Sequence, residues 1–97
     1  MNRSPYAVDR YVIDTLMADL VGHDHQPSAF LVYLAILAAA ADGRAAVSYA
    51  ELAERTGLAK RTTQLAVAAL RKRSLIAVAR RGPTDVPEYR PLFPWRR

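Results

Sequence analysis

The side chains best suited to chemistry are the basic ones, and they gather in the second part of the chain. Residues 60–97 carry ten Lys and Arg against two acidic residues, a net charge of +8, whereas residues 1–59 carry a net charge of −3. A compact basic region suits a polyanionic partner, although a solvated basic face that only aids solubility would have the same composition. The order of the structural elements has to decide between these two interpretations.

The segment His23-Asp24-His25 places two imidazoles and a carboxylate within three residues, a composition that could suggest a metal site. Adjacent side chains diverge in a loop, and the chain has no cysteine and no third histidine to complete a tetrahedral set. Asp24 fits the role of a helix cap equally well. We therefore expect no metal site at this segment.

The serines do not form a catalytic set either. The four serines have only the two histidines as possible bases, and a helix cap already explains Ser48. The four glycines are isolated, so no phosphate-binding glycine loop is present. We expect no enzyme activity and no cofactor.

The composition is that of one small globular domain. The chain has 97 residues, of which 52% are hydrophobic and 24% charged, so a single core can close without a metal or a disulfide. The longest apolar run, residues 29–41, is too short for a membrane span of about 20 residues, and the chain does not open with a signal-peptide pattern. These features predict a soluble cytoplasmic protein.

The first part of the chain predicts two helices. Ser4-Pro5 resembles an N-cap followed by proline at the first helical position, and apolar residues at helical spacing predict a helix from Pro5 to Val21, ended by Gly22. Pro27 opens a second helix that runs to about Ala41. This helix is apolar nearly all round, so it is predicted to be the central helix of the core.

A third and a fourth helix follow a complete start signal. Ser48 and Glu51 match the S-x-x-E capping box, while Val47 and Leu52 can form the hydrophobic staple around it. The third helix is predicted from Tyr49 to Thr56. Gly57 provides the sharp turn, and the fourth helix is predicted from Lys60 to Arg73.

The end of the chain predicts a small β-hairpin. Leu75–Arg80 has β-branched residues at alternate positions, which predicts a strand. Arg81–Pro87 is predicted to be a loop, and Glu88–Leu92 is predicted to be a returning strand. Pro91 should confine that second strand to an edge or end it. Ala45–Val47 can add one very short strand. The predicted fold class is mainly α with a small β-hairpin.

This order of elements is that of a winged helix-turn-helix, and residues 49–70 resemble the winged-helix bacterial regulators of the GntR and MarR types. The resemblance implies one winged helix-turn-helix domain over residues 1–97, with an extra N-terminal helix at 5–21 and a winged-helix core at 27–92. Ala59 departs from the pattern, because the family usually has a serine cap there, and Thr63 stands where an aliphatic residue is common. The residues that carry the resemblance are Leu52, Ala53, Gly57, Leu58, Thr62, Ala66, Leu70, Leu75 and Ile76.

The resemblance makes the fourth helix the DNA-recognition helix. Its apolar face should carry Thr63, Ala66, Val67 and Leu70, and the opposite face should meet DNA. We expect Arg61 and Gln64 to read bases, because Arg pairs with guanine and Gln with adenine. The other candidates are expected to contact phosphates or thymine methyl groups. The full set of candidate DNA-binding residues is Tyr49, Lys60, Arg61, Thr62, Gln64, Leu65, Ala68, Arg71, Lys72, Arg80 and Arg81.

The predicted function is therefore a nucleoid-associated, sequence-specific regulator that binds double-stranded DNA, most simply as a repressor. A homodimer could form through the N-terminal helix or the apolar C-terminal tail at residues 92–95, although the helix could simply cover its own core and the tail could pack on the domain or bind another partner. Two alternatives stay open. The domain could be a winged-helix module for protein interaction, or a DNA-binding protein of plasmid or phage replication or partition.

Overall fold

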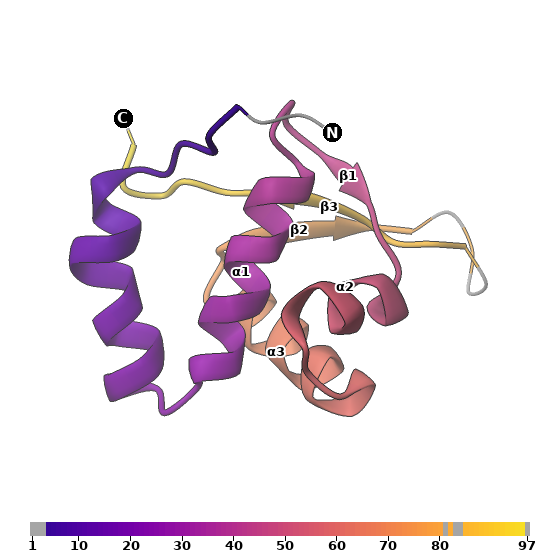
Figure 1. The fold of residues 1–97 in the computed structure, drawn as a ribbon, viewed down its shortest axis with the longest axis horizontal. Helices are drawn as coiled ribbons and strands as arrows, with labels where there is room; N and C mark the ends of the chain where they lie inside the picture. Colours follow the sequence, from indigo (N-terminus) through magenta and orange to yellow (C-terminus); the bar gives the residue numbers. More distant parts are fainter. Residues whose placement is uncertain (1–3, 81, 83–84, 97) are drawn as a thin grey trace.

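The computed structural model describes residues 4–80, 82 and 85–96. Within these residues a continuous N-terminal helix at 10–23 is followed by three α-helices and three short strands (Figure 1). The N-terminal helix contains two π-helical segments. The elements in chain order are η1 (Val12–Leu16), η2 (Asp19–His23), α1 (Pro27–Ala39), β1 (Ala45–Ala46), α2 (Tyr49–Thr56), α3 (Lys60–Lys72), β2 (Ile76–Ala79) and β3 (Glu88–Pro91).

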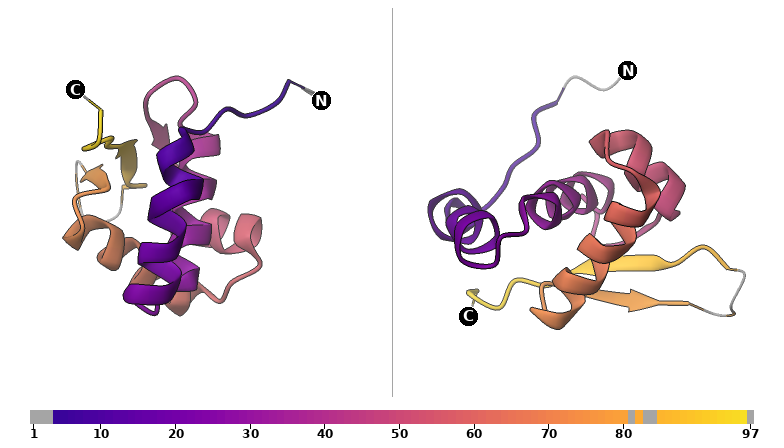
Figure 2. Two further views of the ribbon diagram at one scale, coloured as in Figure 1. Left: turned by 90° about the vertical axis from the view of Figure 1, so that its left-hand side faces the viewer. Right: turned by 90° about the horizontal axis from the view of Figure 1, so that it is seen from below.

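Helix α1 is the centre of the structure, as its composition predicts. The N-terminal helix lies on one side of α1, and α2 and α3 lie on the other, with the sheet beneath α1 and α3 (Figure 2). Phe30 and Ile36 are buried, and the buried Tyr33 hydroxyl donates a hydrogen bond to the carbonyl oxygen of Leu92 at 3.4 Å. The predicted end at Ala41 is two residues too long. No helix in the described part of the chain has the length and apolar character needed to cross a membrane.

The N-terminal helix is held to the core by apolar residues spaced by four. A spacing of four drifts around an α-helix of 3.6 residues per turn, and the wider π turns, closed by i→i+5 hydrogen bonds, offset that drift. Val12, Leu16 and Leu20 therefore stay on one buried side. A second stripe with the same spacing is exposed, and we call it the apolar stripe: Ile13, Met17 and Val21.

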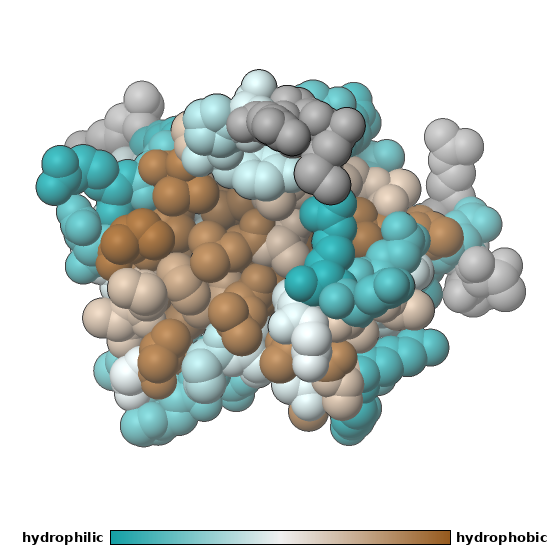
Figure 3. All heavy atoms as spheres, viewed as in Figure 1, coloured by the Kyte–Doolittle hydropathy of each residue, from teal (hydrophilic) through white to brown (hydrophobic). Residues whose placement is uncertain are grey.

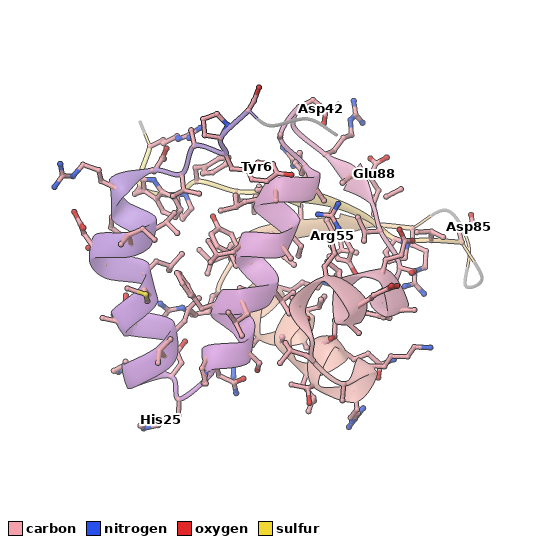
Figure 4. All side chains as sticks on the ribbon, viewed as in Figure 1. Tyr6, His25, Asp42, Arg55, Asp85 and Glu88 are labelled. Atoms are coloured by element: carbon pink, nitrogen blue, oxygen red, sulfur yellow. The ribbon has the colours of Figure 1, made fainter. Side chains whose placement is uncertain are left out.

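The predicted start of this helix is wrong. Residues 4–9 form no helix, and the helical conformation begins at Arg10. Tyr6 lies over the C-terminal half of α1 (Figure 4) and lines a small pocket with Leu34 and Leu37. Contact with α1 thus takes precedence over the local helix-start signal at Ser4-Pro5.

The predicted end of the N-terminal helix at Gly22 is also wrong. The helix continues to His23, and the left-handed turn falls at His25, with φ of 54°, while the Gln26 amide donates to the carbonyl of Leu20 at 2.7 Å. Asp24 does not cap α1, because Gln26 occupies the N-cap position. Asp24 instead pairs with Arg73 at 3.5 Å, and this contact ties the end of the N-terminal helix to the end of α3.

The three strands form one antiparallel sheet in the order β1-β3-β2. The returning strand β3 is therefore central and not at an edge, although Pro91 does end it. The Leu92 amide donates to the Leu75 carbonyl beyond the start of β2 at 2.9 Å. The backbone amides of successive strand residues point alternately toward the two neighbouring strands. Because the Leu92 amide points toward the β2 side, the nitrogen of Pro91, which has no hydrogen to donate, points toward the β1 side. The two-residue β1 pairs only with Glu88 and Tyr89 and does not reach Pro91, so this position of β3 tolerates a proline.

The C-terminal tail packs on its own domain around one carboxylate. Asp9 accepts hydrogen bonds from the Trp95 indole at 2.8 Å and from two nitrogens of Arg96, both at 2.7 Å. The Trp95 ring stacks on Tyr11 with centroids 4.6 Å apart, and the Arg96 guanidinium lies 3.8 Å from the centroid of the Phe93 ring. We call this contact the Asp9 clamp. Of the roles that the sequence left open for the tail, the structure selects packing against the N-terminal segment.

The Asp9 clamp should stabilise the fold at neutral pH. The hydrogen bonds from Arg96 and then Trp95 lower the pKa of Asp9 from 3.8 to about 2, against a smaller opposing effect of burial. Asp9→Asn should therefore lower the Tm by a few degrees at pH 7 and change the fluorescence of Trp95, the single tryptophan. Because the folded-state pKa is depressed, the difference from the wild type should disappear as the pH falls from about 4 to about 2.

Asp14→Asn is the matched control. Asp14 pairs with the exposed Arg10, four residues away at 3.4 Å, and such surface pairs contribute little. An Asp9→Asn protein with unchanged Tm and unchanged fluorescence at pH 7 would contradict the clamp.

Candidate nucleic-acid interface

Helix α2 begins at the predicted capping box. The Ser48 hydroxyl oxygen accepts the Glu51 amide hydrogen bond at 3.1 Å, and the Glu51 carboxylate accepts that of Ser48 at 3.2 Å. Val47 and Leu52, the predicted staple, are both buried. The start of α2 is thus determined by neighbouring residues and confirms the sequence analysis.

The turn between α2 and α3 is set by Gly57 and by a residue that the sequence analysis missed. Gly57 adopts φ of 78°, as predicted for a sharp turn. The Thr56 hydroxyl donates to the Leu52 carbonyl at 2.8 Å and accepts the Leu58 amide at 3.3 Å. The position of Thr56 directly before the turn glycine was the available signal for this role.

Helix α3 starts without a side-chain cap. Ala59 occupies the N-cap position in an extended conformation and, as its side chain requires, forms no capping hydrogen bond. The hydroxyl of Thr63 donates to the Ala59 carbonyl at 3.1 Å, which explains how a threonine can be fully buried where an aliphatic residue is common. The amides of the first turn of α3 are left without a capping side chain, a feature that suits an anion.

The two faces of α3 agree with the prediction. The buried face carries Thr63, Ala66, Val67 and Leu70. On the opposite side Leu65 is 52% exposed, and Thr62 and Gln64 are half-buried. The remaining predicted residues of this helix are all exposed: Lys60, Arg61, Ala68, Arg71 and Lys72.

The basic residues of α3 differ from several other basic residues of the chain in that they form no ion pairs with the described residues. Four arginines elsewhere each pair with a carboxylate within 3.5 Å: Arg10, Arg44, Arg73 and Arg96. Among the described residues, four cations of α3 form no ion pair: Lys60, Arg61, Arg71 and Lys72. The exposed side of α3 is therefore a positive surface, and no carboxylate of the described residues pairs with its cations.

The β2–β3 hairpin forms the predicted wing. Figure 1 shows it extending past α2, and Asp85 lies near its far end (Figure 4). Arg80 is exposed directly after β2, while Arg81 lies outside the described residues. At the base of the wing Arg44 pairs with Glu88 at 3.5 Å. The wing brings Arg80 into the same region of the fold as α2.

Two tyrosines meet where α2 joins the sheet. Tyr49, a predicted phosphate contact, is the first residue of α2 and is half-buried against the core. Tyr89 on β3 is fully buried, and burial raises the pKa of its hydroxyl above the usual value of 10, with Tyr49 adding to the rise. The sequence analysis did not single out Tyr89, because an aromatic residue in a strand indicates only packing.

The segment His23-Asp24-His25 is used structurally. The Nδ1 atom of His23 lies 2.9 Å from one carboxylate oxygen of Asp24, and the other oxygen pairs with Arg73. Within the described residues, no three His, Cys, Asp or Glu side chains are grouped so that they could hold a metal ion.

Comparison with known sequences identifies the α2–turn–α3 unit. The profile of the helix-turn-helix domain family matches residues 26–76, from the residue before α1 to the first residue of β2. Comparison with curated proteins and with solved structures gives no significant match. With the matched region covering just over half of the chain, and with α2, the Gly57 turn and α3 in the expected arrangement, the protein belongs to the helix-turn-helix family, a fold that suggests DNA as its partner.

Proposed function

We propose that the protein is a sequence-specific regulator of transcription that binds double-stranded DNA and acts as a dimeric repressor at the bacterial nucleoid, with no catalytic activity. The observation that carries the proposal is the positive surface of α3, whose cations have no ion pairs among the described residues. Such cations are available to phosphates. Occupying a DNA site excludes other proteins from it, so repression needs no further activity.

Base reading is assigned to Arg61 and Gln64. Both lie in the first two turns of α3, the part of a recognition helix that reaches base edges. Arginine can bond guanine through two hydrogen bonds and glutamine can bond adenine in the same way, while Leu65 or Ala68 can contact a thymine methyl group. Phosphate contact is assigned to the other members of the predicted set: Tyr49, Lys60, Thr62, Arg71, Lys72, Arg80 and Arg81.

Selection of duplexes from a random library at about 150 mM salt should enrich one sequence, because purely electrostatic binding is weak at that ionic strength. Arg61→Ala and Gln64→Ala should each weaken binding by about 1–3 kcal/mol and relax the preference at one base position. Lys72→Ala should weaken binding to all sequences alike and reduce the dependence of affinity on salt.

Arg10→Ala is the control for these variants, because Arg10 is exposed but lies on the N-terminal helix and pairs with Asp14. Its DNA affinity should equal that of the wild type. Equal weakening on every sequence by Arg61→Ala, Gln64→Ala and Lys72→Ala would refute the base-reading assignment. A library without any enriched sequence would refute sequence-specific recognition.

The dimer is assigned to the N-terminal helix, because the tail is already packed against Asp9 and Tyr11. Ile13 and Val21 lie at equal distances along the chain from Met17, so the apolar stripe can pack on its own copy about a two-fold axis. Apolar side chains gather over this helix and α1 on the face in Figure 3. The helix lies across α1 from α2 (Figure 2), so pairing here would leave α3 open to DNA.

Met17→Glu should convert the dimer to a monomer, because it would place two carboxylates at the centre of an apolar contact. Sedimentation velocity measures the change, and the selected DNA should change from an inverted repeat with half-sites about 10 bp apart to a single half-site. Ala18→Glu is the matched control, since Ala18 is also exposed on this helix but lies outside the apolar stripe. A monomeric wild type, or a dimer that tolerates Met17→Glu, would refute this assignment.

A further inference from the structure

A cavity lies between residues 4–9, the C-terminal end of α1 and the C-terminal tail. Residues 4–9, which we call the strap, cross the end of α1 without forming a helix (Figure 1). The cavity has a volume of about 290 Å³, close to the lower limit of about 300 Å³ for ligand pockets. We call it the strap cavity. Its walls are mostly apolar, and all of their residues belong to the described part of the chain; the main ones are Ala7, Val8, Val12, Leu37, Ala40 and Phe93.

The sequence explains why the strap cavity stays open. Residues 38–41 are four consecutive alanines, so the end of α1 has no long side chain with which to fill the space beneath the strap. The Asp9 clamp holds the last residue of the strap to Trp95 and Arg96 of the tail. Protein interiors are close-packed and contain few voids larger than a water molecule. A space of this size between segments that a clamp holds in place therefore suits an occupant.

The polar groups of the wall determine what an occupant can bond to. Asp9 and Arg96 are the charged residues that line the strap cavity. The Asp9 carboxylate already accepts hydrogen bonds from the Trp95 indole and from two nitrogens of Arg96, which use most of its acceptor sites. The Arg96 guanidinium has further N–H groups that Asp9 does not engage. The wall therefore offers hydrogen-bond donors to an occupant more than acceptors.

The charge of the wall favours a neutral molecule. Asp9 and Arg96 are paired at 2.7 Å, so their charges compensate each other. Ala40 and Ala41 place the C-terminal end of α1 in the wall, and the negative end of the helix dipole disfavours an anion there. The N–H groups of Arg96 disfavour a cation. A neutral group that accepts a hydrogen bond meets both conditions.

We propose that the strap cavity binds a small, neutral, mainly apolar molecule with one carbonyl oxygen, which accepts a hydrogen bond from Arg96. The apolar body of this molecule lies against Val12, Leu37 and Phe93, where burial removes its surface from water. This site goes beyond the proposed function, and it does not depend on DNA binding, because none of its lining residues lies on α3.

The test uses cyclohexanone as the probe and methylenecyclohexane, which has the same shape but no acceptor oxygen, as the reference compound. Each is titrated into the ¹⁵N-labelled full chain while the amide chemical shifts are followed. Cyclohexanone should produce saturable shifts at residues 7–9, 40–43 and 93–96, with a Kd in the millimolar range that suits so small a molecule. Cyclohexanecarboxylate should bind more weakly, because its charge faces the negative end of α1.

Ala40→Leu should fill the strap cavity and abolish the saturable shifts, because Ala40 lines the cavity and is only 6% exposed. Ala7→Leu, at an exposed position of the strap, is a second filling variant that does not disturb the core. Ala38→Leu is the matched control, since Ala38 lies on the same helix but lines the neighbouring pocket beside Tyr6. It should bind cyclohexanone as the wild type does.

Arg96→Lys tests the hydrogen bond. Lysine keeps the positive charge beside Asp9 but lacks the second edge of the guanidinium. The affinity for cyclohexanone, relative to that for methylenecyclohexane, should fall by about threefold to tenfold, the effect of one hydrogen bond. Comparing the two compounds cancels any change in the shape of the cavity.

Four results would overturn the inference: shifts that do not saturate, shifts confined to the pocket beside Tyr6, tighter binding of cyclohexanecarboxylate, or an unchanged affinity ratio in Arg96→Lys. None of them bears on the proposed function, which the selection of duplexes tests separately.

Discussion

The rest of the structure depends on the need to cover α1. Its side chains are apolar on nearly every side, so the helix must be enclosed from several directions at once. The N-terminal helix covers one side, α2 and α3 cover another, and β3 lies along a third. Each covering element buries its apolar face here, and this determines its outer face: an apolar stripe on the N-terminal helix and a positive surface on α3.

Ion pairing also differs between the N-terminal side of the domain and the exposed side of α3. Arg73 bonds Asp19 and Asp24, and Arg96 bonds Asp9, so these cations hold the N-terminal helix and the segment before it to α3 and to the tail. These contacts use the carboxylates of the N-terminal region for internal pairing. The cations of α3 face solvent on the other side of the molecule, where their charge remains available to a polyanion.

Much of the fold and the exposed face of the candidate site could be predicted, because they depend on interactions between residues that are close in the sequence. Ser48 bonds Glu51 three residues away, and Gly57 needs only its own backbone freedom to turn the chain. Trp95, which bonds Asp9, and Leu92, which bonds Tyr33, lie 86 and 59 residues away from their partners, so no local pattern could indicate them. The full burial of Tyr89 could not be predicted for the same reason, since it depends on the strands that only folding brings to either side of β3.

The sequence by itself determined the order of the elements, the limits of α2, the turn at Gly57 and the two faces of α3, because periodicity, capping and glycine conformation act over a few residues. Only the tertiary structure decided where the N-terminal helix begins and that β3 is the central strand. It also decided that the tail closes on Asp9. These features arise when distant segments compete for the same buried surface, and packing and hydrogen bonding across that surface then outweigh local preference.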